Sequence, residues 1–397
     1  MFRTLFLVLT AMFLLVLGTY IPGTILTPYA KTIGATWFQI GILSGSMYAV
    51  RLFIGTPVGR LADRKGTLKV LKYSFLLYPF IAAAYWLSPN IYFLICARLL
   101  HGVASAMMLP MGLAYVGEKS PRGMEGKYMA LYNSCMMLAS GIGPLISTAV
   151  ASSLSYRSTF AVLFILAIIG LLIILLYAKN CKIDNNKLIW NEKRYGSANL
   201  FKDRRMMALG VINIALAVVS SLVGFFMIPF LEERGVALMF SGSVIAVYNI
   251  VSAAIQLPLG RITDKYNKFP IVIFSGVLTA VSLLVFPFTN NILLIGTAMI
   301  LTSIGSGSLL AASSALSTII GREKGMGSTM GFLSTSTSIG MIFGCITLSY
   351  MPKIGYNFVS FFYFSSLAVI ACIILFGIFW TNKGRNSKPT VKFTNLD

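Results

Sequence analysis

Residues 59–66 read Gly-Arg-Leu-Ala-Asp-Arg-Lys-Gly, and residues 260–265 read Gly-Arg-Ile-Thr-Asp-Lys. The two stretches lie 201 residues apart, and the same offset aligns further glycines, prolines and charged residues without a gap. The matched pairs include Gly23 with Gly224, Pro28 with Pro229, Gly34 with Gly235, Pro57 with Pro258, Asp63 with Asp264, Gly126 with Gly327 and Gly143 with Gly344. A repeat of this length predicts two units of the same topology.

The composition excludes a water-soluble protein. Of the 397 residues, 57% are hydrophobic and only 11% are charged, which leaves too few polar residues to cover a soluble surface. Twelve apolar stretches have about the 20 residues that cross a hydrocarbon core as a helix. They are residues 4–27, 38–58, 70–88, 91–115, 128–151, 158–178, 207–230, 240–260, 270–288, 292–318, 329–350 and 358–380. We therefore expect an all-α membrane protein with twelve transmembrane helices in two pseudo-symmetric six-helix bundles.

These stretches predict four parts of the chain. The parts are an N-terminal six-helix bundle at 1–178, a cytoplasmic linker at 179–206, a C-terminal six-helix bundle at 207–381 and a cytoplasmic tail at 382–397. The linker is rich in basic residues, so we expect it to tether the halves and to lie against anionic lipid headgroups. Parallel repeats of this kind are typical of transporters with a substrate site between the two halves.

The net charge of +21 indicates how the chain is oriented in the membrane, and it does not point to a negatively charged partner. If the N-terminus is cytoplasmic, the segments on that side hold 26 basic residues and the opposite segments hold four. This imbalance predicts that both termini are cytoplasmic. No basic arm or RNA-binding signature accompanies the charge, so we expect no nucleic-acid partner. The prediction is a monomeric, multi-pass protein of the cell membrane.

Cysteine and histidine are too sparse to form a disulfide framework or a zinc site. The five cysteines occur singly, and the chain has one histidine. The cysteines are Cys96, Cys135, Cys181, Cys345 and Cys372. We expect no metal and no cofactor, and a membrane-embedded enzyme is disfavoured because most such chemistry needs metal-binding acids, histidine clusters or an activated nucleophile.

The stretch between the second and third spans, with its shorter copy, resembles the loop signature of the major facilitator superfamily. The position, the duplication and the twelve-span layout extend this resemblance over the whole chain. It implies that Asp63 faces the start of the eleventh span near Gly327, and that Arg64 pairs with an acid at the end of the fourth span, here Glu118. A carboxylate at such a place can cap a helix N-terminus. The residues assigned to this gating signature are Gly59, Asp63, Arg64, Gly66, Glu118, Gly260, Asp264 and Lys265.

Two more spans carry family-like motifs. The fourth span contains Arg98-Leu-Leu-His101-Gly-Val-Ala104, similar to the R-x-x-Q-G-x-G-A helix of the family with histidine in place of glutamine and alanine in place of the second glycine. The fifth contains Gly141-Ile-Gly143-Pro144, similar to the Gly-Pro signature of the drug:proton antiporter branch, where small residues pack around a proline bend. In that family the signature accompanies efflux, so the resemblance implies an exporter.

Two arginines, Arg51 and Arg98, fall within the predicted spans, whereas none of the eleven acidic residues lies mid-membrane. An arginine at the membrane centre costs about 2.5 to 3.5 kcal/mol, so both must face protein or a water-filled cavity. The repeat places Ser252 and Met299 at the equivalent positions, so the architecture does not require either arginine. Both are candidates for substrate binding, and the alternative is a hydrogen-bonded clamp between helices.

The other candidates are polar residues inside the spans. His101 lies one turn from Arg98 on the same face and has a side chain able to exchange protons near neutrality, although it can also be a polar packing residue. Tyr48, Asn133, Asn213, Asn249 and Gln256 are candidates for a central cavity. Amides inside membrane helices also serve as hydrogen bonds between helices, so both interpretations stay open.

The leading functional prediction is a secondary active transporter that exports small organic molecules by alternating access, coupled to protons. The alternative is an exporter or exchanger of an anionic metabolite or a metal-chelating small molecule, because two buried arginines without a buried acid suit an anion better than a cationic drug. A non-transporting membrane receptor is a remote alternative, since it explains the duplicated signature less well.

Overall fold

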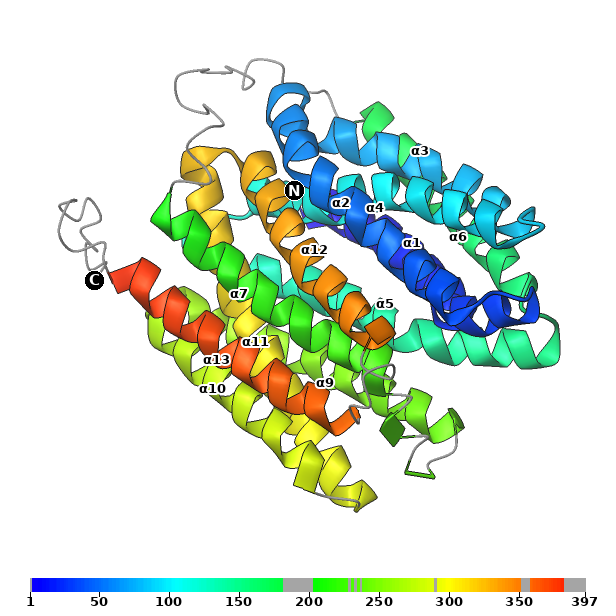
Figure 1. The fold of residues 1–397 in the computed structure, drawn as a ribbon. Helices are drawn as coiled ribbons and strands as arrows, with labels where there is room; N and C mark the ends of the chain where they lie inside the picture. The colour runs from blue at the N-terminus through cyan, green and yellow to red at the C-terminus, as the bar shows by residue number, and fades with distance from the viewer. Residues whose placement is uncertain are drawn as a thin grey trace.

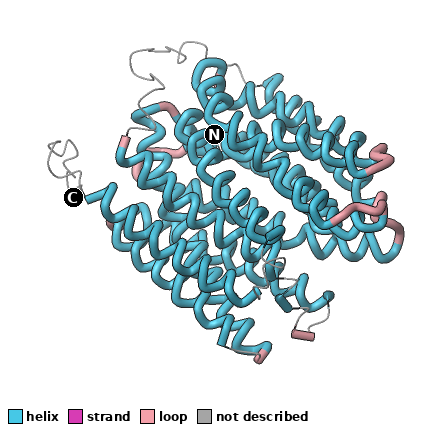
Figure 2. Tube along the Cα trace, in the orientation of Figure 1, coloured by secondary structure: helices cyan, strands magenta, loops and turns pink. Residues whose placement is uncertain are grey.

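The computed structural model describes residues 2–180, 203–227, 230–231, 234–235, 238–288, 291–350 and 358–381. Most of the predicted linker (181–202), with Cys181, and the predicted tail (382–397) lie outside the described residues. Throughout the described part the secondary structure is helical, and no strand occurs there. Figure 2 shows long helices joined by short loops.

In the described residues, twelve long helices are arranged in two groups, in the order that the sequence predicts. The first group comprises α1 (Phe2–Thr32), α2 (Trp37–Lys65), α3 (Thr67–Trp86), α4 (Ile91–Lys119), α5 (Glu125–Ser153) and α6 (Ser158–Asn180). The second comprises α7 (Arg204–Ser221), α9 (Leu238–Lys265), α10 (Lys268–Val285), α11 (Ile292–Lys324), α12 (Met326–Tyr350) and α13 (Phe358–Thr381). Short turns η3 (Leu222–Phe226), a π-helix, and η4 (Phe286–Phe288) follow α7 and α10. Figure 1 shows the two six-helix bundles side by side, which confirms the predicted fold class.

Eleven of the described helices are long and apolar enough to cross a membrane. The remaining long helix, α3, carries Lys69, Lys72 and three tyrosines, which lower its mean hydropathy. Several helices extend beyond the predicted spans; α4, for example, continues to Lys119. The apolar stretch marks only the part that lies in hydrocarbon, whereas the helix continues into the polar region at its end.

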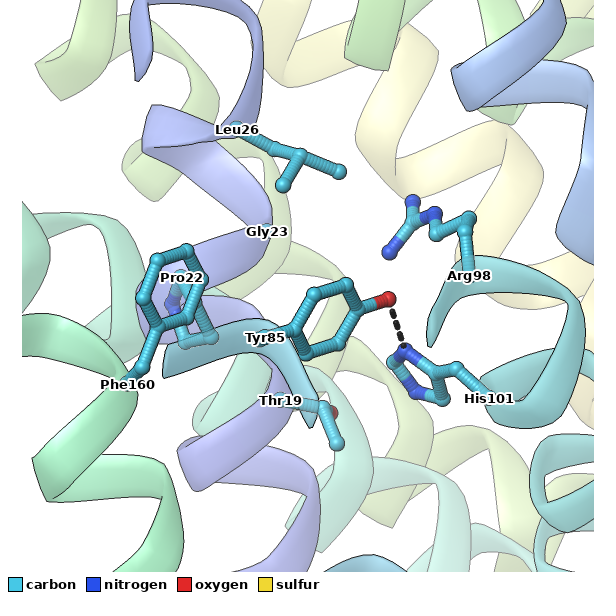
Figure 3. A pocket seen from close by; sticks show the side chains of 8 residues that line it. All are labelled: Thr19, Pro22, Gly23, Leu26, Tyr85, Arg98, His101 and Phe160. Atoms are coloured by element: carbon cyan, nitrogen blue, oxygen red, sulfur yellow. Dashed lines mark hydrogen bonds between the residues drawn. The ribbon is translucent and has the colours of Figure 1, made fainter. Parts of the chain in front are cut away.

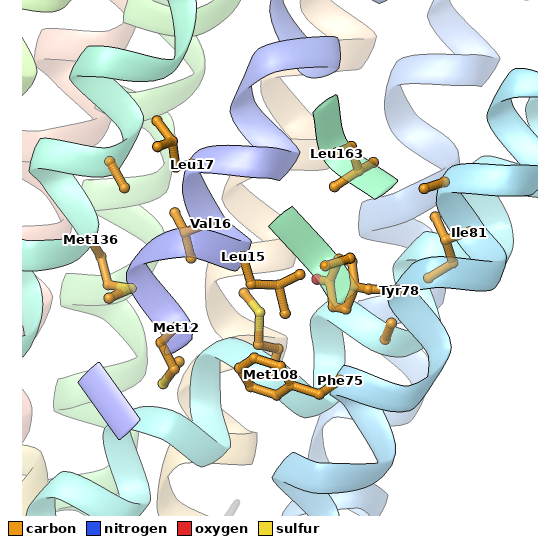
Figure 4. Close-up of a cluster of buried hydrophobic side chains, with 14 of the residues drawn as sticks. Met12, Leu15, Val16, Leu17, Phe75, Tyr78, Ile81, Met108, Met136 and Leu163 are labelled. Carbon is orange, nitrogen blue, oxygen red and sulfur yellow. The ribbon is translucent and has the colours of Figure 1, made fainter. Parts of the chain in front are cut away.

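Each bundle has its own apolar core, which gives it rigidity. In the first, Met12 and Leu15 of α1 pack against Phe75 and Tyr78 of α3 and Met108 of α4, and all five are buried (Figure 4). In the second, one cluster contains the stacked rings of Phe286 and Phe362 with Phe230 tilted against Phe362, and another surrounds Leu209 of α7 and Met330 of α12. The polar residues discussed below lie mainly where the two bundles meet.

A glycine joins α2 to α3 and another joins α11 to α12. Gly66 has φ of 93° and Gly325 has φ of 103°, a region in which side chains other than glycine are strained. Gly66 therefore allows the chain to reverse directly after the signature at 59–66, and this reversal places Asp63 beside the other bundle.

Candidate functional site

The signature residues gather at one end of the molecule, where α2, α4, α9 and α11 end and α3, α5, α10 and α12 begin. We call this the signature end; it lies towards the upper left of Figure 1. Here Asp63 of α2 accepts hydrogen bonds from the backbone N–H groups of Gly327 (2.7 Å) and Ser328 (2.8 Å), at the start of α12. A carboxylate at a helix N-terminus satisfies free N–H donors and complements the helix dipole. Asp63 thus joins the first bundle to the second at the position that the resemblance implied.

Asp264 of α9 makes the same contact in the opposite direction. It accepts hydrogen bonds from the N–H groups of Gly126 (2.6 Å) and Lys127 (3.0 Å), at the start of α5. This partner was not among the predictions, although the 201-residue offset contains the signal: it converts the contact of Asp63 with Gly327 into a contact of Asp264 with Gly126. Each bundle therefore caps a helix of the other.

Glycines bring the backbones together beside both caps. A side chain on Gly59 of α2 would place its Cβ 2.3 Å from the carbonyl oxygen of Gly327, and one on Gly331 would lie 2.5 Å from the carbonyl oxygen of Gly55. Between α5 and α9, a Cβ on Gly126 would lie 2.4 Å from the carbonyl oxygen of Gly260. Such distances are far below van der Waals contact, so only glycine permits these crossings.

The two crossings differ in their glycine content. The α2–α12 crossing contains four glycines, at positions 55, 59, 327 and 331. The repeat places Gln256, Gly260, Gly126 and Ala130 at the equivalent positions of the α5–α9 crossing. Two of the four glycines are thus replaced by larger residues, and one of these is the polar Gln256.

Ion pairs at the signature end add to these contacts. Arg322 at the end of α11 pairs with Glu125 at the start of α5 and donates to the Ser120 hydroxyl (2.9 Å), which links the two bundles. Within the second bundle, Lys324 pairs with Asp203, and Arg205 Nη1 lies 3.1 Å from Glu323 Oε2. These pairs were not predicted, because no motif or spacing connects residues so far apart in the chain.

The pKa of Asp203 is lowered from its ordinary value. Partial burial acts to raise it, but the hydrogen bond and positive charge of Lys324 outweigh burial, and the N–H groups of Arg205 and Met206 add to the lowering. Asp203 is the N-cap of α7, so the ionised carboxylate holds the start of α7 against the end of α11.

The remaining signature residues lie at the surface of the signature end. Arg64 and Lys265 are exposed. Glu118 Oε2 accepts a hydrogen bond from the Thr67 hydroxyl at 2.8 Å, which joins α4 to the start of α3. The pairing of Glu118 with Arg64 stays a prediction.

Arg51 connects the two bundles further along α2. Its side chain is buried, Nη2 donates to the Ser334 hydroxyl of α12 (3.2 Å), and the guanidinium carbon lies 5.9 Å from the centre of the Tyr48 ring. Its Nε has no hydrogen-bond partner among the described residues. A neutral hydroxyl and an aromatic ring compensate a buried guanidinium only partly.

Arg98 and His101 line a small pocket of the first bundle (Figure 3). The pocket is bordered by Thr19, Pro22, Gly23 and Leu26 of α1, Tyr85 of α3, Arg98 and His101 of α4, and Phe160 of α6. The Tyr85 hydroxyl and His101 Nδ1 lie 3.1 Å apart in a hydrogen bond. Arg98 points into the pocket towards Tyr85, and its Nε also lacks a partner within the described residues. The guanidinium thus has donor capacity available for a ligand.

Arg51 and Arg98 have electrostatic neighbours in common. Tyr48 and Tyr78 each interact electrostatically with both Arg51 and Arg98, and so does His101. No aspartate or glutamate is among the interaction partners of these two arginines in the described structure. The centre of the first bundle is therefore positively charged and rich in tyrosine.

The amide candidates do not gather in one cavity. Asn133 of α5 donates to Ser314 (2.9 Å), and Asn213 of α7 donates to Ser313 (3.1 Å), so both contact α11. Asn249 donates to a carbonyl of its own helix, that of Ile245 (3.1 Å). Gln256 is fully buried, and neither its Nε2 nor its Oε1 has a partner in the described part of the chain.

The predicted antiporter kink lies within a continuous helix. α5 runs through Pro144. A Cβ on Gly143 would lie 2.6 Å from Tyr20 Cβ of α1, and one on Gly141 would lie 3.3 Å from Asn249 Cβ of α9. The small residues around Pro144 thus let α5 pack closely against one helix of each bundle. 

Four hydroxyl-bearing partners of the candidates inside the spans were not predicted: Ser313, Ser314, Ser334 and Tyr85. Serine and tyrosine are common in these spans, so no sequence signal distinguished them. Among the described residues no group of three or more His, Cys, Asp and Glu side chains is placed to hold a metal ion.

Comparison with known proteins agrees with this architecture. The profile of the Major Facilitator Superfamily matches residues 8–235 and 209–394. An uncharacterised MFS-type transporter of Methanocaldococcus jannaschii is 24% identical over 355 residues, 89% of this chain and 92% of the relative. The multi-drug resistance efflux pump PmrA homologue of Lactococcus lactis is 21% identical over 80% of both chains, and the quinolone resistance protein NorA of Staphylococcus aureus is 26% identical over 36% of this chain and 37% of its own.

Solved structures share the fold at low sequence identity. The proton:xylose symporter XylE superposes with a TM-score of 0.78 at 12% identity, over 95% of each chain. The human organic anion transporter MFSD10 superposes with a TM-score of 0.73 at 13% identity, over 94% of this chain and 99% of its own.

Proposed function

The chain belongs to the Major Facilitator Superfamily, and from this membership we propose that it is a secondary active exporter of small organic molecules that works by alternating access. It is a multi-span integral membrane transporter and not an enzyme. Export, the coupling ion and the substrate are the parts that we propose. We also propose that the protein is a monomer in the cell membrane. The signature end and both termini lie in the cytoplasm in this proposal, because the basic residues concentrate in the segments on that side.

The observation that carries the proposal is the reciprocal capping at the signature end. Asp63 and Asp264 each bond to the first turn of a helix in the opposite bundle, and Arg322 pairs with Glu125 across the same boundary. All these contacts are polar and reversible, so the end that they close can also open. This supports alternating access, in which the bundles separate at one end at a time.

Two findings support export. Relatives that match over most of their length are named as multidrug efflux pumps, and the Gly141 to Pro144 motif is similar to the antiporter signature. Both concern the family branch, and neither identifies a substrate.

Proton coupling has its best candidate in His101. Its hydrogen bond with Tyr85 and its place beside Arg98 put a group able to exchange protons next to a group able to bind substrate. Since no acid lies mid-membrane, His101 is the first residue to test.

A second candidate function is export or exchange of an anionic substrate, including an acidic metal chelator. It is favoured by Arg51 and Arg98, whose Nε atoms lack described partners and whose surroundings contain no described carboxylate. An anion would supply the charge compensation that Ser334 and the tyrosines provide only in part.

Transport into proteoliposomes separates the two functions. Vesicles with and without a pH gradient would be tested with a lipophilic cation, a neutral aromatic compound and an organic anion, for the wild type and for Arg98→Gln. If the substrate is an anion, we expect saturable anion transport that Arg98→Gln reduces at least about tenfold, the equivalent of about 1.4 kcal/mol. Transport of the cation alone, unchanged in Arg98→Gln, would exclude the anionic function. No transport of any compound under any gradient would contradict the exporter proposal.

A further inference from the structure

A second cavity lies between α7 and α12, away from the arginines. Its volume is about 150 Å³, and its lining is almost entirely apolar. Met207, Val211 and Ile214 of α7 form one wall, and Phe332, Thr335 and Ile339 of α12 form the other. The wall on α7 runs from position 207 to position 214, about 10 Å along the helix axis. We call this cavity the α7–α12 groove.

The groove opens on the outer, membrane-facing side of the second bundle. Ile339 is 44% exposed, and Val211 is partly exposed. Asn213 lies on a different face of α7 from Val211 and bonds to Ser313 of α11, inside the second bundle. Figure 1 shows α7 and α12 side by side at the front of the molecule. A ligand in the groove would therefore come from the bilayer.

The internal repeat shows that the architecture does not require this groove. The equivalents of Gly210 and Ile214, which both line it, are Leu9 and Phe13 in the first bundle. Leu9 is 4% exposed and belongs to the apolar core, and Phe13 packs against that core. Where the first bundle has large side chains, the second has a glycine and a smaller aliphatic residue, so the space is left for another apolar occupant.

A basic residue stands at the end of the groove. Arg204 lies three residues before Met207 on the same face of α7, since positions 204, 207, 211 and 214 follow helical spacing. Its neighbours are neutralised in pairs, Lys324 with Asp203 and Arg205 with Glu323. Arg204 is exposed and has no ion-pair partner within the described ranges. The groove thus combines an apolar channel with one available positive charge at the signature end.

We propose that the α7–α12 groove binds one phospholipid with an anionic headgroup, whose phosphate pairs with Arg204 and whose acyl chain lies against Met207, Val211 and Ile214. The dimensions and polarity fit a chain that enters from the leaflet at the signature end, and the charge at its mouth selects an anionic headgroup. This proposal does not depend on the transported substrate.

The bound chain would touch the crossing that closes the signature end. Thr335 lines the groove, and its hydroxyl lies 3.1 Å from that of Thr56 on α2. A lipid that fills the space behind Thr335 supports α12 against α2. Anionic lipid therefore stabilises the arrangement in which the signature end is closed.

Native mass spectrometry of the purified full-length protein tests the site. The protein in detergent would be titrated with phosphatidylglycerol and, separately, with phosphatidylcholine of the same acyl chains. We expect one phosphatidylglycerol to bind about fivefold more tightly than phosphatidylcholine, the equivalent of about 1 kcal/mol for one basic residue near an anionic headgroup. Glycerol 3-phosphate, which has the anionic group without chains, should not displace it.

Two variants separate the parts of the site. Arg204→Gln should remove the preference for phosphatidylglycerol while retaining the acyl-chain contact. Ile214→Phe, which introduces the residue of the first bundle, should weaken both lipids at least about tenfold. Met207→Trp provides a second filled groove should Ile214→Phe fold poorly. The matched controls are Arg122→Gln, an exposed arginine elsewhere at the signature end, and Ile374→Phe, an isoleucine 57% exposed on α13.

The outcomes are exclusive. Loss of headgroup preference in Arg204→Gln, together with loss of lipid in the two filled variants and unchanged binding in both controls, supports the site. Retained preference in Arg204→Gln overturns the assignment of the headgroup. Unchanged lipid binding in a folded Ile214→Phe or Met207→Trp protein overturns the assignment of the groove.

Discussion

Asp63 and Asp264 stand in the same relationship to opposite halves of the protein: each accepts two backbone N–H bonds from the first turn of a helix that belongs to the other bundle. Because the contacts are reciprocal, both bundles hold a charged residue and a free helix terminus at the same end. Separation of the bundles would expose two carboxylates and two helix N-termini together, so we expect the four hydrogen bonds to break in a concerted way.

Asp63→Asn should destabilise the closed signature end. The neutral amide keeps the size of the side chain but loses the charged acceptor, and hydrogen bonds to charged groups contribute about 1.5 to 3 kcal/mol. Distances between spin labels at positions 69 and 266, both exposed, would report the separation of the bundles at this end. We expect a longer distance in Asp63→Asn and in Asp264→Asn. Glu323→Gln is the control, because its pairing with Arg205 is largely exposed and such pairs contribute at most about 1 kcal/mol.

Gly59→Ala should prevent close approach of α2 and α12. The added Cβ would lie 2.3 Å from the Gly327 carbonyl oxygen, and a backbone atom cannot move away as a flexible side chain can. The same label distance should increase, and the protein should unfold at a lower temperature, with overpacking costs of about 1 to 3 kcal/mol. Gly296→Ala is the matched control, because nothing lies within 4 Å of the added atom. Equal behaviour of the two variants would contradict the role of the glycine crossing.

Gln256→Leu should raise the unfolding temperature. A buried amide without partners costs about 1 to 3 kcal/mol, and an apolar side chain of similar size removes that cost. Asn133→Leu makes the same chemical change where the amide has a partner, Ser314, and should lower the unfolding temperature. A decrease in both variants would mean that water or another group satisfies Gln256.

Asp203→Asn should lower stability at neutral pH but not in acid. The pKa of Asp203 is lowered in the folded protein by Lys324, so its contribution to stability is present above the ordinary carboxyl pKa of 3.8 and is lost as the pH falls through the lower folded pKa. Thermal unfolding of both detergent-solubilised proteins between pH 3 and pH 7 should show a difference that decreases towards the acid end. A constant difference over this range would exclude titration of Asp203 as its cause.

His101→Gln should change the pH profile of transport. Glutamine is the usual residue of the family motif and can still bond to Tyr85, but it cannot bind a proton. Initial rates in proteoliposomes across pH 5.5 to 8.5 would be compared with those of the wild type. A variant with unchanged rates and an unchanged profile would exclude His101 as the coupling residue and leave it a packing residue.

The architecture could be predicted because the length of each apolar stretch and the internal repeat can both be read directly along the sequence. The twelve spans needed only apolar runs, and the position of Asp63 came from a family motif. The ion pairs of Arg322 and Lys324 could not be predicted, since they join residues more than one hundred positions apart that share no periodicity. The partner of Asp264, in contrast, is related to that of Asp63 by the same 201-residue offset that defines the repeat.

The candidate site was predictable only in part, because the sequence identifies polar residues within the spans but not their partners. A polar residue within a span must face protein, but the sequence does not say whether its partner is a ligand or a serine. Asn133 and Asn213 proved to contact serines of α11, whereas Arg51 and Arg98 retain unpartnered Nε atoms.

The unequal glycine content of the two crossings has a consequence for the shape of the opening. At the signature end α2 and α12 meet through four glycines, whereas two of the four equivalent positions of α5 and α9 are glycines and a third is a glutamine whose amide lacks a partner among the described residues. The second crossing should therefore part at lower cost than the first. The bundles would then rotate about the α2–α12 crossing, and a substrate would enter through the gap that opens between α5 and α9.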